Sequence, residues 1–101
     1  MNIFENILIN KESEEFIEIL KNKNIRIERI VSNEQISPKD FWYKQEENEF
    51  VLLLEGSAII EFEENQVSLE RGDYINIKAH VKHRIKYTSK DEATIWLAVF
   101  Y

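Results

Sequence analysis

The chain of 101 residues contains no cysteine, two glycines and a single proline. Without cysteine it can form no disulfide and no zinc–thiolate site, and it has no thiol nucleophile. Two isolated glycines exclude a glycine-rich phosphate loop, and no serine lies in a recognisable nucleophile motif. The lack of cysteine fits a reducing compartment.

Long apolar runs and a basic charge balance are missing too. The longest apolar runs, 50–54 and 95–101, are too short to cross a bilayer. The first residues lack the basic start and apolar stretch of a signal peptide. The net charge of −6 argues against a nucleic-acid partner, because such proteins usually present a basic face to phosphates. We therefore expect a soluble, cytoplasmic protein that binds neither nucleic acid nor membrane.

Only the front of the chain has a helical pattern. Four apolar residues recur there at helix spacing, namely Phe16, Ile17, Ile19 and Leu20. Asn22, Lys23 and Asn24 then provide a reasonable stop. We predict that residues 1–24 form a short helical segment that packs on the rest of the domain, residues 25–101.

From residue 25 onward the pattern is typical of strands. Short runs rich in β-branched and aromatic residues, including an aromatic one at 41–43, alternate with turn signals at 37–40, 55–56, 64–65 and 71–73. Seven or eight short strands of this kind favour a sandwich or a barrel. No repeat or linker divides the chain, so we predict a single all-β domain spanning 1–101.

Two of the expected strands are apolar on both faces. They are residues 49–54, apart from Glu49 itself, and residues 94–101. A strand of this kind is covered on both sides. The interior of a barrel can cover one side, while the other side requires either the N-terminal helix or a second copy of the chain. A homodimer is therefore expected, with the helix as the alternative.

Three polar residues are predicted to lie inside the barrel or at its mouth. Glu49 shares a face with Val51 and Leu53, and Gln45 lies just upstream on the same hairpin arm. In the segment 82–88, His83, Ile85 and Tyr87 alternate with Lys82, Arg84 and Lys86. The alternation places the imidazole inside and the three basic side chains on a solvated face. A carboxylate in a barrel interior must be hydrogen-bonded, paired or bound to a metal.

The spacing of these residues resembles the two motifs of the cupin superfamily. The first motif matches Tyr43, Gln45, Glu49 and Gly56, and the second matches Gly72, His80, His83 and Tyr87. The resemblance implies a double-stranded β-helix, that is, a cupin or jelly-roll barrel. It is greatest to small, stand-alone bacterial cupins whose role is poorly defined.

The resemblance also implies a metal site, but the chain departs from it. Cupins usually hold a divalent metal with three histidines and the glutamate, and here only Glu49 and His83 keep those residue types. The implied ligands are Gln45, Glu49 and His83, holding one Zn, Fe, Mn or Ni ion with water completing the shell. The alternative is a metal-free polar cluster of the same side chains. We expect His80 to lie at the rim.

Four aromatic residues are candidates for a ligand pocket: Trp42, Tyr43, Tyr74 and Tyr87. Core packing would explain them equally well. We predict a protein that binds a small molecule in the barrel mouth, with or without a metal. The alternatives are a metal-dependent cupin enzyme, such as a dioxygenase, isomerase or epimerase, and a mainly structural dimer.

Overall fold

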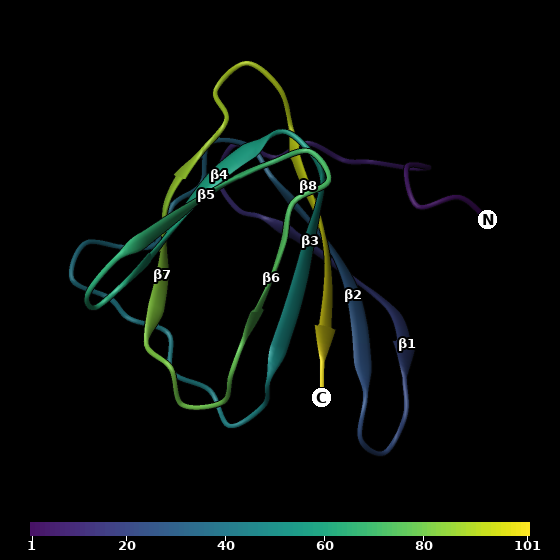
Figure 1. Cartoon of the computed structure of the whole chain (residues 1–101). Helices are drawn as coiled ribbons and strands as arrows, with labels where there is room; N and C mark the ends of the chain where they lie inside the picture. Colours follow the sequence, from purple (N-terminus) through teal and green to yellow (C-terminus); the bar gives the residue numbers. More distant parts are fainter.

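The computed structural model describes all residues 1–101, and it contains eight strands and no helix (Figure 1). Accordingly, no helix in it is long and apolar enough to cross a membrane. The prediction of an all-β fold is confirmed. The strands are β1 (Glu15–Lys21), β2 (Arg26–Ser32), β3 (Glu49–Glu55), β4 (Ser57–Phe62), β5 (Gln66–Glu70), β6 (Tyr74–Ile77), β7 (His83–Thr88) and β8 (Thr94–Phe100).

The strands form two antiparallel sheets. The larger has the order β1-β2-β8-β3-β6, and the smaller has the order β5-β4-β7. The inward residues of both sheets meet in one core, with Leu53, Trp96 and Ala98 from the larger sheet and Ala58 and Ile60 from the smaller. This arrangement is the predicted jelly-roll barrel, and its small size leaves room for only one core.

Gly56 makes the turn where the chain leaves the larger sheet at β3 and enters the smaller sheet at β4. Its φ is +89°, and an added Cβ would lie 2.7 Å from the Cα of Thr94. A side chain would therefore be strained and would also collide with β8. The glycine allows β3 and β8 to lie close together where the two sheets join.

The predicted N-terminal helix is not formed, because its apolar residues belong to the edge strand β1. Phe16 pairs with Ile30 and Ile17 pairs with Arg29, but a bulge follows, so that Leu20 pairs with Ile27. A bulge adds one residue and breaks the two-residue alternation of a strand. The irregular alternation in β1 therefore resembles helix spacing, which explains the incorrect prediction.

The predicted aromatic strand at 41–43 is also reduced, to an isolated bridge between Tyr43 and His83. The loop that carries it connects β2 to the start of β3. Its backbone is fixed by two bonds across that bridge, from Tyr43 N to the His83 carbonyl (2.8 Å) and from His83 N to the Tyr43 carbonyl (3.0 Å). This loop positions Tyr43 and Gln45 for the site.

The N-terminal residues before β1 are held by a buried arginine of β2. Arg29 donates from Nη1 to the carbonyl oxygens of Ile3 (3.2 Å) and Glu5 (2.6 Å). Its Nη2 lies 2.8 Å from Oε1 of Glu15 in a buried ion pair. The guanidinium thereby joins the N-terminal residues, β1 and β2.

Candidate functional site

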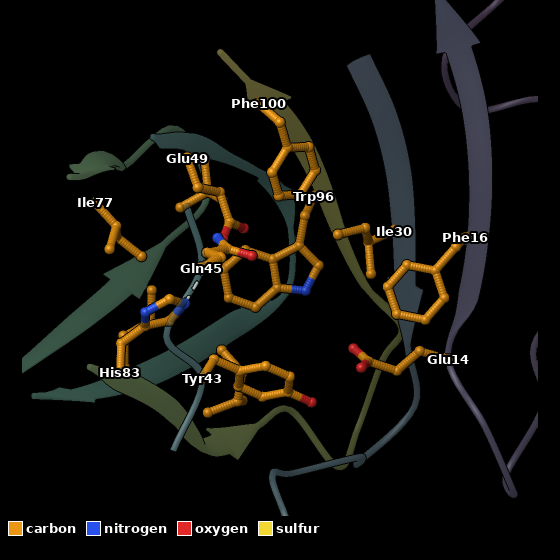
Figure 2. A pocket seen from close by; sticks show the side chains of 13 residues that line it. Glu14, Phe16, Ile30, Tyr43, Gln45, Glu49, Ile77, His83, Trp96 and Phe100 are labelled. Carbon is orange, nitrogen blue, oxygen red and sulfur yellow. Dashed lines mark hydrogen bonds and ion pairs between the residues drawn. The ribbon is translucent and has the colours of Figure 1, made fainter. Parts of the chain in front are cut away.

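A cavity of about 160 Å³ lies between the two sheets at the barrel mouth (Figure 2). Nine of its 13 lining residues are apolar, namely Phe16, Ile30, Tyr43, Val51, Ile60, Ile77, Ile85, Trp96 and Phe100. The polar lining residues are Glu14, Gln45, Glu49 and His83, and no lysine or arginine is among them. An engineered apolar cavity of about 150 Å³ holds benzene, so this one has room for a molecule of that size.

The structure brings together the three polar residues that the sequence singled out. Gln45 Nε2 donates to Oε1 of Glu49 at 2.6 Å, and Nε2 of His83 lies 3.6 Å from the same oxygen. Glu49 is the first residue of β3 and His83 the first of β7, so each sheet supplies one of the pair. The other carboxylate oxygen of Glu49 accepts no bond from the protein and can meet a ligand.

The His83 imidazole is fixed on several sides and is only 5% exposed. Its Nδ1 lies 3.0 Å from the Val81 carbonyl oxygen, so Nδ1 carries a proton and Nε2 faces Glu49. Burial opposes a charged imidazole, but the Glu49 carboxylate and the Val81 carbonyl outweigh that effect. Together they raise the pKa of His83 above its ordinary 6.5. The site thus favours an imidazolium–carboxylate pair.

Tyr43 forms part of the cavity wall next to this pair. Its ring is stacked against the imidazole of His83, with 6.0 Å between ring centroids and 30° between planes. The tyrosine is 41% exposed and stands where the cavity opens. In Figure 2 its hydroxyl points toward the carboxyl group of Glu14. Tyr43 can therefore contact a ligand with both its ring and its hydroxyl.

Glu14 is a cavity residue that sequence reasoning missed. It immediately precedes β1, and its Oε2 accepts a hydrogen bond from the Ser32 hydroxyl. The indole N–H of Trp96 donates in turn to that hydroxyl oxygen at 3.3 Å. Burial raises the pKa of Glu14, although the Ser32 hydrogen bond lowers it in part. Reading residues 14–18 as a strand would have placed Glu14 on the same inward face as Phe16.

Three predicted pocket residues lie outside the cavity lining. Trp42 is half-buried, and the guanidinium carbon of Arg84 lies 5.9 Å from the centre of the Trp42 ring. Tyr74 is 67% exposed and packs against Phe50. Tyr87 is turned outward because the register shifts between β4 and β7, so that Thr88 is buried instead.

His80 is exposed at its side chain, and its backbone N–H donates to the Gln45 carbonyl oxygen at 2.8 Å.

The donor set fits a divalent metal poorly. Glu49 and His83 are the two strong ligands, and no group of three or more His, Cys, Asp or Glu side chains is arranged to hold an ion. Gln45 offers only a neutral amide, and its NH₂ group is directed at Glu49. Gln45 and His83 both contact Oε1 of Glu49, as in the metal-free cluster that is the alternative to a metal site. The metal site stays a prediction that needs a direct test.

Comparisons with known proteins agree with this architecture. A crystal structure from Ralstonia eutropha JMP134, described as a proposed mannose-6-phosphate isomerase, is 38% identical, with a TM-score of 0.95 over 99% of this chain and 94% of that one. A conserved Streptococcus pyogenes protein of unknown function is 16% identical, with a TM-score of 0.78 over 99% and 83% of the two chains. A cupin superfamily protein from Desulfitobacterium hafniense DCB-2 is 17% identical, with a TM-score of 0.77 over 93% and 82%.

The last two comparisons show the fold alone, because their sequence identity is low. No curated protein matches the chain in sequence. A family model described as "Cupin domain" matches residues 29–100, which include β3 to β8 and all of the polar cluster around Glu49. The chain is therefore a member of the cupin superfamily.

Proposed function

We propose that this cupin binds a small organic molecule in the cavity at the barrel mouth, with Gln45, Glu49 and His83 as its polar contacts. The observation that carries the proposal is the combination of an apolar cavity of about 160 Å³ with one convergent polar cluster. Ligand sites commonly pair apolar walls with a few polar groups that fix orientation.

The electrostatics of the polar cluster support this assignment. Glu49 and His83 form a nearly buried ion pair in a cavity with few other polar groups. Such groups are costly to bury and gain from a further hydrogen bond. The free oxygen of Glu49 can accept that bond from a ligand hydroxyl or amine. The cluster therefore contributes orientation, and the surrounding aromatic and aliphatic walls contribute apolar burial.

Phenol is a suitable probe, because it combines a ring of the right size with one hydroxyl. The chain has two tryptophans, of which Trp96 lines the cavity and Trp42 does not. In ¹H–¹⁵N NMR titrations, phenol should shift the indole N–H signal of Trp96 and leave that of Trp42 unchanged. Benzene, which has no hydroxyl, should bind more weakly. A shift of neither indole signal at saturating phenol would refute the proposal.

A pair of matched variants tests the location of binding. Ile30→Phe adds volume inside the cavity and should block phenol, whereas Ile59→Phe adds the same volume to a half-buried residue outside the lining. The second variant should bind phenol like the unmodified protein. Equal binding by both variants would place the phenol site elsewhere.

The metal-dependent enzyme remains the second candidate, because Nε2 of His83 and Oε1 of Glu49 converge at 3.6 Å. Elemental mass spectrometry after loading with zinc, iron, manganese and nickel separates the two candidates. The weak donor set predicts far less than one ion per chain. Near-stoichiometric metal that is lost in His83→Ala would instead favour the dioxygenase or isomerase type of cupin.

We also propose that the protein forms a homodimer through the outer face of the larger sheet. Phe50, Leu52, Leu97 and Val99 are apolar and only half-buried there, and no helix covers them. Light scattering should give twice the chain mass, and Leu97→Lys should halve it. Ile59→Lys, on the smaller sheet, is the matched control.

Cytoplasmic location and the lack of a nucleic-acid partner stay predictions of the sequence.

A further inference from the structure

The cavity has two polar ends that accept hydrogen bonds. Figure 2 shows Gln45, Glu49 and His83 on one side of the Trp96 indole and Glu14 on the other. At each end one carboxyl oxygen is already engaged by the protein, Oε1 of Glu49 by Gln45 and Oε2 of Glu14 by Ser32. The remaining oxygen of each carboxyl group accepts no bond from the protein.

The Ser32 hydroxyl fixes the Glu14 end in one orientation. Since the Trp96 indole N–H donates to the Ser32 oxygen, the hydroxyl proton is directed to Glu14. Ser32 and Trp96 are both buried, so this chain of hydrogen bonds is shielded from water. The Glu14 carboxyl group is therefore a preorganised contact for a ligand and does not behave as a mobile surface group.

The charge of the lining disfavours an anionic ligand. No lysine or arginine faces the cavity, and the imidazole of His83 is paired with Glu49. The two basic residues of β7 lie near one glutamate instead, with Arg84 3.7 Å and Lys86 4.0 Å from Glu61. A phosphate or carboxylate placed in the cavity would lose its hydration without gaining an opposite charge.

We propose, on the basis of the small-molecule function above, that the cavity selects small uncharged molecules that donate a hydrogen bond at each end, one to Glu49 and one to Glu14. Diols and dihydroxy aromatic compounds are of this class. Sugar phosphates are not, although a similar protein is described as a proposed mannose-6-phosphate isomerase. The distinguishing group is Glu14, which gives the cavity its second polar end.

The test compares ligands that differ in one group. Phenol has one hydroxyl, hydroquinone has two at opposite ends, and benzoate has an anionic group, all on the same ring. Each is titrated into the full chain under argon, with the Trp96 indole N–H signal as the measurement and that of Trp42 as the internal control. Hydroquinone should bind about three- to tenfold more tightly than phenol, the range expected for one added net hydrogen bond. Benzoate and mannose 6-phosphate should bind more weakly than both.

Variants of Glu14 assign the second end. Glu14→Leu should remove the advantage of hydroquinone over phenol, so that the ratio of the two affinities falls to about one. Glu14→Gln keeps a hydrogen-bonding group at the same place and should retain most of the difference. Glu12→Gln, exposed and two residues away, is the control for a change of net charge. A merely structural role of Glu14 would change the affinities for phenol and hydroquinone by the same factor and leave their ratio unchanged.

The outcomes separate this inference from the function on which it rests. Phenol and hydroquinone binding equally well to the unmodified protein would overturn the two-ended ligand but leave the small-molecule site intact. Benzoate or mannose 6-phosphate binding as tightly as hydroquinone would overturn the exclusion of anions. A Trp96 signal that responds to no probe would overturn both the inference and the proposed function.

Discussion

At one end of the cavity Gln45, Glu49 and His83 bond mainly to one another, whereas at the other end Glu14 is held by Ser32 and, through it, by Trp96. The first end is a charged pair between β3 and β7. The second is a single carboxyl group that accepts from the Ser32 hydroxyl of β2, whose oxygen in turn accepts from the Trp96 indole of β8. The difference shows that one cavity can contain both a carboxylate paired with an imidazole and a separate carboxyl group whose pKa burial raises.

Removing the wall between the two ends should have the largest effect. Trp96 lies in the core, and Trp96→Ala would remove the packing that both ends share as well as the donor to Ser32. Replacement of a buried tryptophan by alanine typically costs about 3–5 kcal/mol in the free energy of unfolding. Urea denaturation measures it. The half-buried Trp42→Ala is the control, and an equal loss there would contradict the central role of Trp96.

The charged end should show a pH dependence that Glu49→Gln removes. The pKa of His83 is raised in the folded chain, so its stabilising effect is fully present below its ordinary value of 6.5. The effect is lost as the pH rises through the higher, folded-state pKa. At about pH 6, Glu49→Gln should lower the free energy of unfolding by about 1.5–3 kcal/mol, the range for a hydrogen bond to a charged group. Thermal melts of the unmodified protein and of Glu49→Gln across neutral pH measure the pH dependence and its loss. Identical pH profiles for the two proteins would refute the pairing of Glu49 with His83.

The Glu14 end should respond to pH with the same sign but for a different reason. The folded-state pKa of Glu14 is raised by burial, so above its ordinary 4.5 the unfolded chain loses this proton more readily. Stability therefore falls as the pH rises through the folded-state pKa. Glu14→Gln cannot ionise, and it should melt at a higher temperature than the unmodified protein at about pH 8, with a smaller difference in acid. A lower melting temperature at both pH values would contradict a destabilising charge at this end.

The smallest effect is expected at an aromatic residue that belongs to neither end. Tyr74 was a predicted pocket residue, but its exposed ring packs against Phe50 outside the cavity. Tyr74→Ala should change the free energy of unfolding by less than about 1 kcal/mol, as most surface substitutions do. Its phenol affinity, measured by the same NMR titration, should not change. A clear loss of phenol binding would extend the site to Tyr74.

The sequence predicted the Glu49–His83 end better than the Glu14 end, for a physical reason. Glu49 and His83 follow regular alternation at the starts of their strands, and period two is readable from sequence. Glu14 lies next to β1, and the bulge between Glu18 and Leu20 gives that strand an apolar spacing that resembles a helix. Tyr87 was misplaced by the same kind of irregularity, a register shift between β4 and β7.

What the sequence could not indicate is contact between distant segments. The bonds of Glu14 to Ser32 and of Ser32 to Trp96 join residues 18 and 64 positions apart. Nothing in their local patterns predicts that they meet. The all-β barrel itself was predictable, because turn residues and short β-branched runs recur along most of the chain.

The arrangement around Arg29 makes one side chain the common anchor of the front of the chain. Its guanidinium donates to the carbonyl oxygens of Ile3 and Glu5, 26 and 24 residues earlier, and to the carboxylate of Glu15, 14 residues earlier. Glu15 lies opposite Val31 in the β1–β2 register, two residues along from Arg29, so the ion pair also ties these two strands together. The bonds of the N-terminal residues to β2 thus depend on one side chain, and they would be lost together if that side chain were replaced. Opening there would uncover a charged group in the same sheet that carries Trp96 and the wall of the cavity.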